Sequence, residues 1–247
     1  MHRVSTVALF LLALIVLGGA GYVISHNNDA PGGQPSGGSP SRTAVASPGL
    51  SSAASASTSP SPAQRTAVFL GDDWTAGVGA SSKAKRFTTL LSRALGLRER
   101  NLGKDGSGYA AESTSKSAYS SRIDRLVAAK PQIVVVSGGR NDVVHDEVTP
   151  AATNAAKIFQ LLHRKLPDAT LVAIAPMWGD SAPPGNLVEL GTAIKKAVSD
   201  VGGTYLDIAD PIRGHTNFMA TSSDPADSGY AAIARALEPK LRPLLPR

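Results

Sequence analysis

The chain has 247 residues and a formal net charge of +6, and its composition changes sharply near residue 66. It contains no cysteine, which excludes disulfides, thiolate zinc sites, cysteine nucleophiles and lipid attachment through an N-terminal cysteine. Lysine and arginine are scattered among acidic residues without a basic tract, so nucleic acid is not an expected partner. We expect one folded domain behind a compositionally distinct first quarter.

Residues 1–26 are predicted to be a membrane anchor. The run from Val4 to Ile24 carries no charge and has about the ~20 apolar residues that cross a bilayer. Arg3 precedes it and Asp29 follows it, so the positive-inside tendency places the N-terminus in the cytoplasm and the rest outside. Cleavage after Ala20 would make the segment a signal peptide and the protein a secreted one. An uncleaved single-pass anchor is preferred, because the apolar run continues past that point.

Residues 27–65 are predicted to be a disordered linker. The segment is dominated by serine, proline, alanine and glycine and has almost no large apolar residue. Such a composition cannot offset the conformational entropy of ordering the chain. We therefore expect residues 66–247 to form a globular, extracytoplasmic domain on a flexible stalk.

The globular part alternates short apolar runs with helical patterns. In chain order the pattern predicts a strand at 66–70, a helix at 84–97, a weak strand at 98–102, a helix at 119–129, a strand at 132–136, a helix at 151–166, a strand at 170–175, a helix at 187–201, a strand at 204–208 and a helix at 228–241. Strands that alternate with helices of this length indicate a mainly parallel sheet covered on both faces, that is, a three-layer α/β/α fold. Ligands of such sheets bind beyond the carboxyl ends of the strands.

Three loops that follow apolar runs carry the polar residues of interest. They read GDDWTAGVG at 71–79, NLGKDGSGY at 101–109 and SGGRND at 137–142. In order and spacing they resemble the loops of the SGNH/GDSL hydrolase family, which contains esterases, lipases and acylhydrolases. The resemblance spans residues 66 to about 241 and implies the flavodoxin-like sandwich of that family. It also implies that Gly106 and Asn141 donate hydrogen bonds to an oxyanion, through a backbone N–H and a side-chain amide.

The sequence departs from the family pattern at all three members of the catalytic triad. Asp73 stands at the position of the nucleophilic serine, Asp224 at that of the histidine and Thr221 at that of the acid. Serine hydrolysis needs a hydroxyl, a base that takes its proton and an acid that holds the base. An alignment shifted to place Asp224 at the acid and Asp227 at the histidine restores neither serine nor histidine.

The histidines near these blocks have simpler interpretations as loop residues. His145 follows the third block and His215 precedes Asp224, and we expect neither to replace the missing base. Ser81 and Ser82 follow the first block and are predicted to cap a helix.

Two carboxylates brought together at Asp73 and Asp224 would suit a cation, a lysine or a polyol, and one pKa of the pair should rise. A metal site that includes Asp72 and Asp142 is conceivable, but Asp-rich loops are commoner than metal sites, so we expect no metal and no cofactor. A carboxyl pair acting on a glycoside stays an open alternative.

We expect an inactive or repurposed family member, a pseudoenzyme that binds a small molecule, lipid or glycan of the cell envelope in the former esterase pocket. The first alternative is a working esterase or acyl hydrolase on ester-bearing lipids or acylated glycans that uses atypical residues. The second is a structural envelope protein. Trp74 and Trp178 each follow a strand and are expected to pack at the edge of the core, with stacking on a sugar as the alternative.

Overall fold

The computed structural model describes residues 64–112, 114 and 117–246. The strands are β1 (Thr66–Gly71), β2 (Arg98–Gly103), β3 (Ile133–Val136), β4 (Thr170–Ile174) and β5 (Thr204–Leu206). The α-helices are α1 (Asp73–Ala76), α2 (Phe87–Ala94), α3 (Ile123–Ala128), α4 (Arg140–Val144), α5 (Val148–Lys165), α6 (Gly185–Ser199) and α7 (Asp227–Leu241). Short 3₁₀ turns are η1 (Lys83–Lys85), η2 (Tyr119–Arg122), η3 (Thr216–Phe218) and η4 (Arg242–Leu244).

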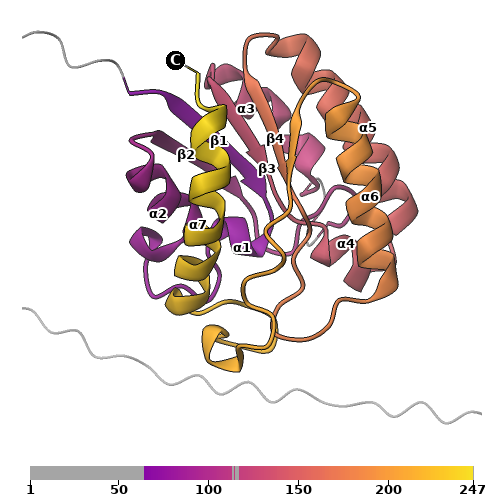
Figure 1. The fold of residues 1–247 in the computed structure, drawn as a ribbon. Coiled ribbons are helices and arrows are strands. Elements are labelled where there is room, and N and C mark those ends of the chain that lie inside the picture. The colour runs from indigo at the N-terminus through magenta and orange to yellow at the C-terminus, as the bar shows by residue number, and fades with distance from the viewer. Residues whose placement is uncertain (1–63, 113, 115–116, 247) are drawn as a thin grey trace, which may run out of the picture. The chain divides into compact units, whose positions relative to one another are not determined.

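The five strands form one parallel sheet in the order β2-β1-β3-β4-β5. The chain passes from β1 to β2 on one side and then crosses to β3 on the other, so strand order reverses at β1 (Figure 1). A crevice opens beyond the carboxyl ends of strands at such a reversal. The predicted parallel three-layer fold is confirmed, and its reversal point lies beside the first and third polar loops.

The middle strand β3 shows why the sheet is covered on both faces. Val134 and Val136 belong to the core beneath α3, α5 and α6, whereas Ile133 and Val135 belong to the core beneath α2 and α7. All four are buried. A strand buried on both faces requires the unbroken β-branched run that the sequence has there. β2 differs, because it is an edge strand whose burial alternates along its length.

Two predicted helices are shorter in the structure. The helix predicted at 84–97 is reduced to α2, because Arg86 has an extended backbone and Gly96 turns into the left-handed region at φ +65°. The helix predicted at 119–129 is divided between η2 and α3. The short helices α1 and α4, which begin inside two of the polar loops, were not predicted.

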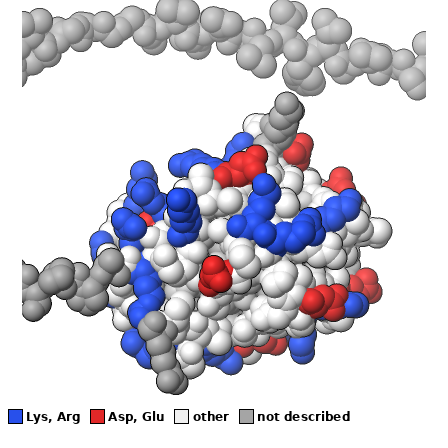
Figure 2. Space-filling model, turned by 90° about the horizontal axis from the view of Figure 1, so that it is seen from above, with Lys and Arg blue, Asp and Glu red and all other residues white. Residues whose placement is uncertain are grey.

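The predicted anchor at 1–26 lies outside the described residues, and so does the linker up to residue 63. Among the described residues no helix is both long and apolar enough to cross a membrane. Figure 2 views the domain from the end at which β1 begins, and lysine and arginine side chains gather there.

Candidate functional site

The candidate site begins directly after β1, where the sequence Gly71-Asp72-Asp73 turns from strand into helix. Asp72 is the N-cap of α1, and its Oδ1 accepts hydrogen bonds from the backbone N–H groups of Trp74 at 3.2 Å and Thr75 at 3.4 Å. Carboxylates are favoured at this position because the first N–H groups of a helix lack partners. The cap fixes the turn that places Asp73 at the carboxyl end of the sheet, where the residue is only 6% exposed.

The carboxylate of Asp73 receives both of the expected oxyanion donors. The backbone N–H of Gly106 donates to Asp73 Oδ1 at 2.5 Å, and Asn141 Nδ2 donates to the same oxygen at 2.9 Å. The Asn141 amide is held in place by a second hydrogen bond, to the carbonyl of Ser107 at 3.0 Å. The two donors that would stabilise an oxyanion in a hydrolase therefore already surround a negatively charged side chain of the protein.

Asp142 holds the loop that carries Gly106. Its buried carboxylate accepts hydrogen bonds from three successive backbone N–H groups, those of Tyr109, Ala110 and Ala111, at 2.8 to 3.0 Å. Gly108 packs against it so closely that a Cβ there would meet both carboxylate oxygens. Burial raises the pKa of Asp142 above its usual value, and the backbone hydrogen bonds offset only part of that rise. The aspartate of the third polar block thus positions the loop of the second block.

Asp72 forms a second buried acidic group behind Asp73. Its pKa is raised to about 8, first by burial and then by the charge of Asp73, against the opposing effect of the capping hydrogen bonds. Gly138, at φ +126°, lies between Asp72 and the hydroxyl of Tyr119, and a Cβ at that position would collide with both. The Tyr119 hydroxyl donates to the carbonyl of Ser137 at 2.8 Å. Gly138 therefore makes room for the buried polar side chains of Asp72 and Tyr119 beneath the site.

Asp105 joins Asp72 and Asp73 in an acidic cluster at the site, and the sequence did not predict this role for Asp105. Partial burial raises its pKa, and so do the charge of Asp73, a hydrogen bond with the Asp73 side chain and the charge of Asp224. The only available signal was its place directly before the expected oxyanion glycine. A carboxyl pair is thus present at the site, and the partner that hydrogen-bonds to Asp73 is Asp105.

Asp224 and Thr221 contact one another at the end of a loop that precedes α7. Thr221 Oγ1 donates to Asp224 Oδ2 at 2.9 Å, and Ser223 Oγ donates to the same oxygen at 2.9 Å. Trp74 Nε1 donates to the Ser223 carbonyl at 2.9 Å, which ties this loop to α1. The structure therefore brings Asp224 and Thr221, the residues predicted at the histidine and acid positions, into contact with each other. The hydrogen bonds of the Asp224 carboxylate that the structure shows are made inside its own loop.

Three residues considered as substitutes for the missing triad members, His145, His215 and Asp227, make other contacts or none that involves Asp73 among the described residues. His145 and His215 are exposed, and neither hydrogen-bonds to Asp73 within the described part of the chain. Asp227 accepts hydrogen bonds from the backbone N–H and the hydroxyl of Ser81, at 2.8 and 2.6 Å. The prediction that Ser81 and Ser82 cap a helix is wrong, because Ser81 instead bonds across the molecule to the first turn of α7 and the side chain of Ser82, the N-cap of η1, makes no capping hydrogen bond.

Two further residues shape the surroundings of the site. The side chain of Arg122 donates to the Gly71 carbonyl and to Ser107 Oγ, both at 3.1 Å, and so joins the end of β1 to the second polar loop. Trp74 is buried, as expected for packing at the core edge, whereas the half-buried Trp178 stacks beneath the guanidinium of Arg140 at 5.0 Å. Across residues 64–112, 114 and 117–246 no group of three or more acidic or histidine side chains is arranged to hold a metal ion.

The comparisons with known proteins support the family resemblance. A model of the GDSL-like lipase/acylhydrolase family matches residues 69–232, which includes all three polar loops. A GDSL lipase of Mycobacterium tuberculosis is 24% identical over 186 residues, covering 70% of this chain and 79% of the relative.

Solved structures share the fold at low sequence identity. A protein of the G-D-S-L family from Desulfitobacterium hafniense aligns with a TM-score of 0.60 at 14% identity, over 71% of this chain and 99% of that one. A family two carbohydrate esterase from Clostridium thermocellum, solved with cellohexaose, aligns with a TM-score of 0.61 at 17% identity, over 74% of this chain and 65% of that one. The family model covers well over half of the chain, and the chain therefore belongs to the GDSL-like lipase/acylhydrolase family.

Proposed function

We propose that this chain is a GDSL-family domain that no longer performs serine-ester hydrolysis and instead binds a ligand in the former active-site pocket. The observation that carries the proposal is the pair of hydrogen bonds from Gly106 and Asn141 to Asp73 Oδ1. A serine esterase keeps such donors for the negative charge that develops on the substrate's carbonyl oxygen. Here a carboxylate holds them in the resting protein.

Electrostatics at the pocket support the loss of that chemistry. An oxyanion placed near Asp73 would face its negative charge and a second carboxyl group, Asp105, instead of two free donors. By the family resemblance Asp224 stands at the position of the base, and its carboxylate accepts hydrogen bonds from Thr221 and Ser223. Both the substitutions at the triad positions and the occupation of the two donors by Asp73 therefore disfavour serine-ester hydrolysis.

The ligand we propose is a carbohydrate or acyl group of the cell envelope. A polyol suits a site rich in carboxyl acceptors, because each hydroxyl of a sugar can donate to one of them. The half-buried Trp178, already paired with Arg140, offers a ring beside the same edge of the sheet. One structural neighbour was solved with cellohexaose, which supports testing cello-oligosaccharides first.

We propose a single-pass membrane anchor with the domain outside the cytoplasm, and the uncharged apolar run at residues 4–24 supports this location. Protease added to intact cells should then remove the domain, whereas an interior control protein should survive. Carbonate extraction distinguishes an anchored chain from a secreted one.

A second candidate function is ester or acyl hydrolysis by the acidic pair itself. The hydrogen bond between the carboxyl groups of Asp73 and Asp105 favours it, since two carboxyls that share a proton can act as an acid and a base. Neither group can act as the serine would, so this activity would depend on both aspartates and would be strongest at acidic pH.

Hydrolysis of p-nitrophenyl acetate by the purified full chain separates the two functions. We expect the wild type and Asp73→Ala to stay at the background rate, and Asp73→Ser/Asp224→His to rise above it because the donors are freed and a base is supplied. Turnover by the wild type that Asp73→Ala abolishes would show that the protein is an active hydrolase. Binding of cellohexaose or octanoate is followed by the fluorescence of the two tryptophans.

A further inference from the structure

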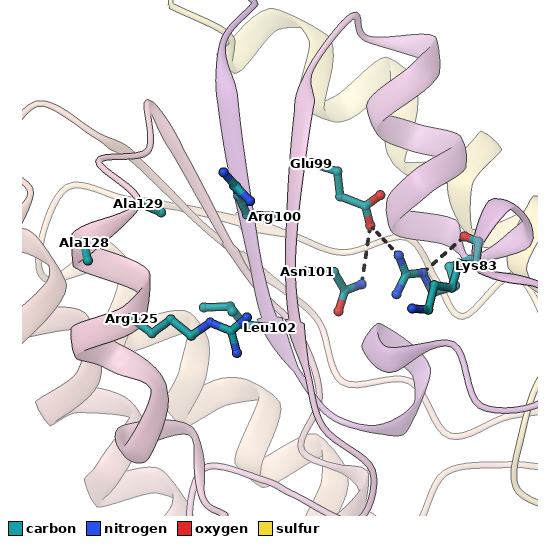
Figure 3. A pocket seen from close by; sticks show the side chains of 9 residues that line it. Lys83, Glu99, Arg100, Asn101, Leu102, Arg125, Ala128 and Ala129 are labelled. Carbon is teal, nitrogen blue, oxygen red and sulfur yellow. Dashed lines mark hydrogen bonds and ion pairs between the residues drawn. The ribbon is translucent and has the colours of Figure 1, made fainter.

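A concave site lies across the edge strand β2, apart from Asp73. This groove has a volume of about 500 Å³, and its walls come from β2, η1 and α3 (Figure 3). The lining includes four cationic side chains and a single acidic one. The cations are Lys83, Arg86, Arg100 and Arg125, and the acid is Glu99.

The one carboxylate of the groove is already fully used by the protein. Glu99 Oε1 accepts hydrogen bonds from Thr88 Oγ1 at 2.6 Å and from Arg86 Nη2 at 3.5 Å, and Oε2 accepts one from Thr89 Oγ1 at 2.7 Å. Glu99 and Arg86 are both largely buried and form an ion pair. The acid therefore neutralises Arg86 and has no capacity to neutralise the remaining cations.

The other three cations have no acidic partner. Lys83, Arg100 and Arg125 are exposed, and none of them takes part in the ion pairs found among the described residues. In Figure 3 Arg125 extends from α3 and Lys83 lies on the opposite side, with Arg100 between them. The groove thus concentrates three uncompensated positive charges around one hollow, which attracts anions more strongly than the same charges spread over a flat surface.

The edge of β2 is too short to take an added peptide strand. Arg98 directs its N–H to the carbonyl of Arg65, so the alternate residues Glu99 and Asn101 direct their backbone groups outward. The next outward N–H, that of Gly103, is taken by Asn101 Oδ1 at 2.8 Å. Strand addition gains its affinity from a row of main-chain hydrogen bonds, which this edge does not offer. Side-chain charge is the recognition chemistry that remains.

We propose that the groove binds a soluble anionic ligand with at least two phosphate or carboxylate groups, held chiefly by Arg100 and Arg125. A guanidinium presents a planar fork of donors that matches both kinds of anion. The volume lies within the range of small-ligand sites, about 300 to 1,000 Å³. The proposal does not depend on what Asp73 does, because no residue of the groove belongs to the acidic cluster.

Titration calorimetry on the full chain in neutral detergent tests the proposal, with tripolyphosphate and tetragalacturonate as the phosphate and carboxylate probes. We expect binding of at least one probe at low salt that weakens as salt is added. The double variant Arg100→Gln/Arg125→Gln should weaken it by about tenfold, because it removes two of the three exposed unpaired charges and exposed charge contacts are individually weak. The matched control Arg164→Gln/Lys165→Gln removes the same charge from the exposed end of α5 and should change affinity less than twofold.

Two outcomes would overturn the proposal: the wild type binds neither probe, or the control variant loses as much affinity as the groove variant. If the chain binds neither soluble probe but does bind vesicles of phosphatidylglycerol, the positive charge serves a membrane surface instead. Circular dichroism of both double variants confirms that the exposed substitutions leave the fold intact.

Discussion

Replacing Asp72 by asparagine should make the protein more stable, and by an amount that grows with pH. Asp72 is 4% exposed and caps α1 through Oδ1, an acceptor that asparagine retains. Its pKa rises from 3.8 to about 8 on folding, mainly because burial disfavours the charge. The folded state therefore holds a proton that the unfolded chain releases above pH 4. The contribution of this protonated carboxyl to the free energy of unfolding is fully present below pH 4 and is lost as pH rises towards 8.

The size of the effect follows from the same shift. Each pKa unit corresponds to about 1.4 kcal/mol, so the wild type should lose about 4 kcal/mol from this group between pH 4 and pH 7. Asp72→Asn has no such loss, and its advantage over the wild type should grow by that amount. Urea unfolding followed by tryptophan fluorescence at pH 4.5, 6, 7 and 8.5 measures it, with the exposed Asp168→Asn as a control for net charge. Stability curves for Asp72→Asn and wild type that run parallel with pH would show that the pKa of Asp72 is not raised on folding.

Two further substitutions test the scaffold of the site. Asp142→Ala leaves three backbone N–H groups without their acceptor, so it should destabilise the domain by about 3 kcal/mol and speed hydrogen exchange of Tyr109, Ala110 and Ala111, with Asp142→Asn intermediate. Unchanged exchange in that loop would contradict the role of Asp142. Gly138→Ala forces a Cβ into the Tyr119 hydroxyl at a left-handed φ and should cost about 3 kcal/mol or more in urea unfolding. Gly202→Ala, at φ +76° but with nothing within 4 Å, should cost only about 1 kcal/mol, and equal losses would exclude the steric explanation.

The arrangement of the sheet could be predicted because its strands are buried on both faces. Few other arrangements bury the apolar run at β3 on both faces. In this one, the loops that follow β1 and β3 must meet at one edge of the sheet. The positions of Gly106 and Asn141 beside Asp73 followed from that topology together with the family resemblance. The ends of α2 were less predictable, because they depend on the local backbone of Arg86 and Gly96.

The direction of the Asp73 side chain could not be predicted. The sequence indicates that two hydrogen-bond donors and a carboxylate lie in loops at the same edge of the sheet. It does not show which atom receives the hydrogen bonds. Asp105 was missed for a similar reason, since a charged residue in a glycine-rich loop usually faces water. Its hydrogen bond with Asp73 forms only when the loop of the second block is folded back by Asp142.

Rescue by formate tests most directly whether Asp73 occupies the oxyanion donors. Asp73→Ala deletes a carboxylate of the same size as formate and leaves the Gly106 N–H and the Asn141 amide free. We expect formate to shift the NMR resonances of these two donors in the variant, with saturation in the millimolar range typical of a single small anion, about 4 kcal/mol of binding free energy. The same additions should leave both resonances of the wild type unchanged. Formate-dependent shifts of equal size in the wild type, or none in the variant, would contradict the account.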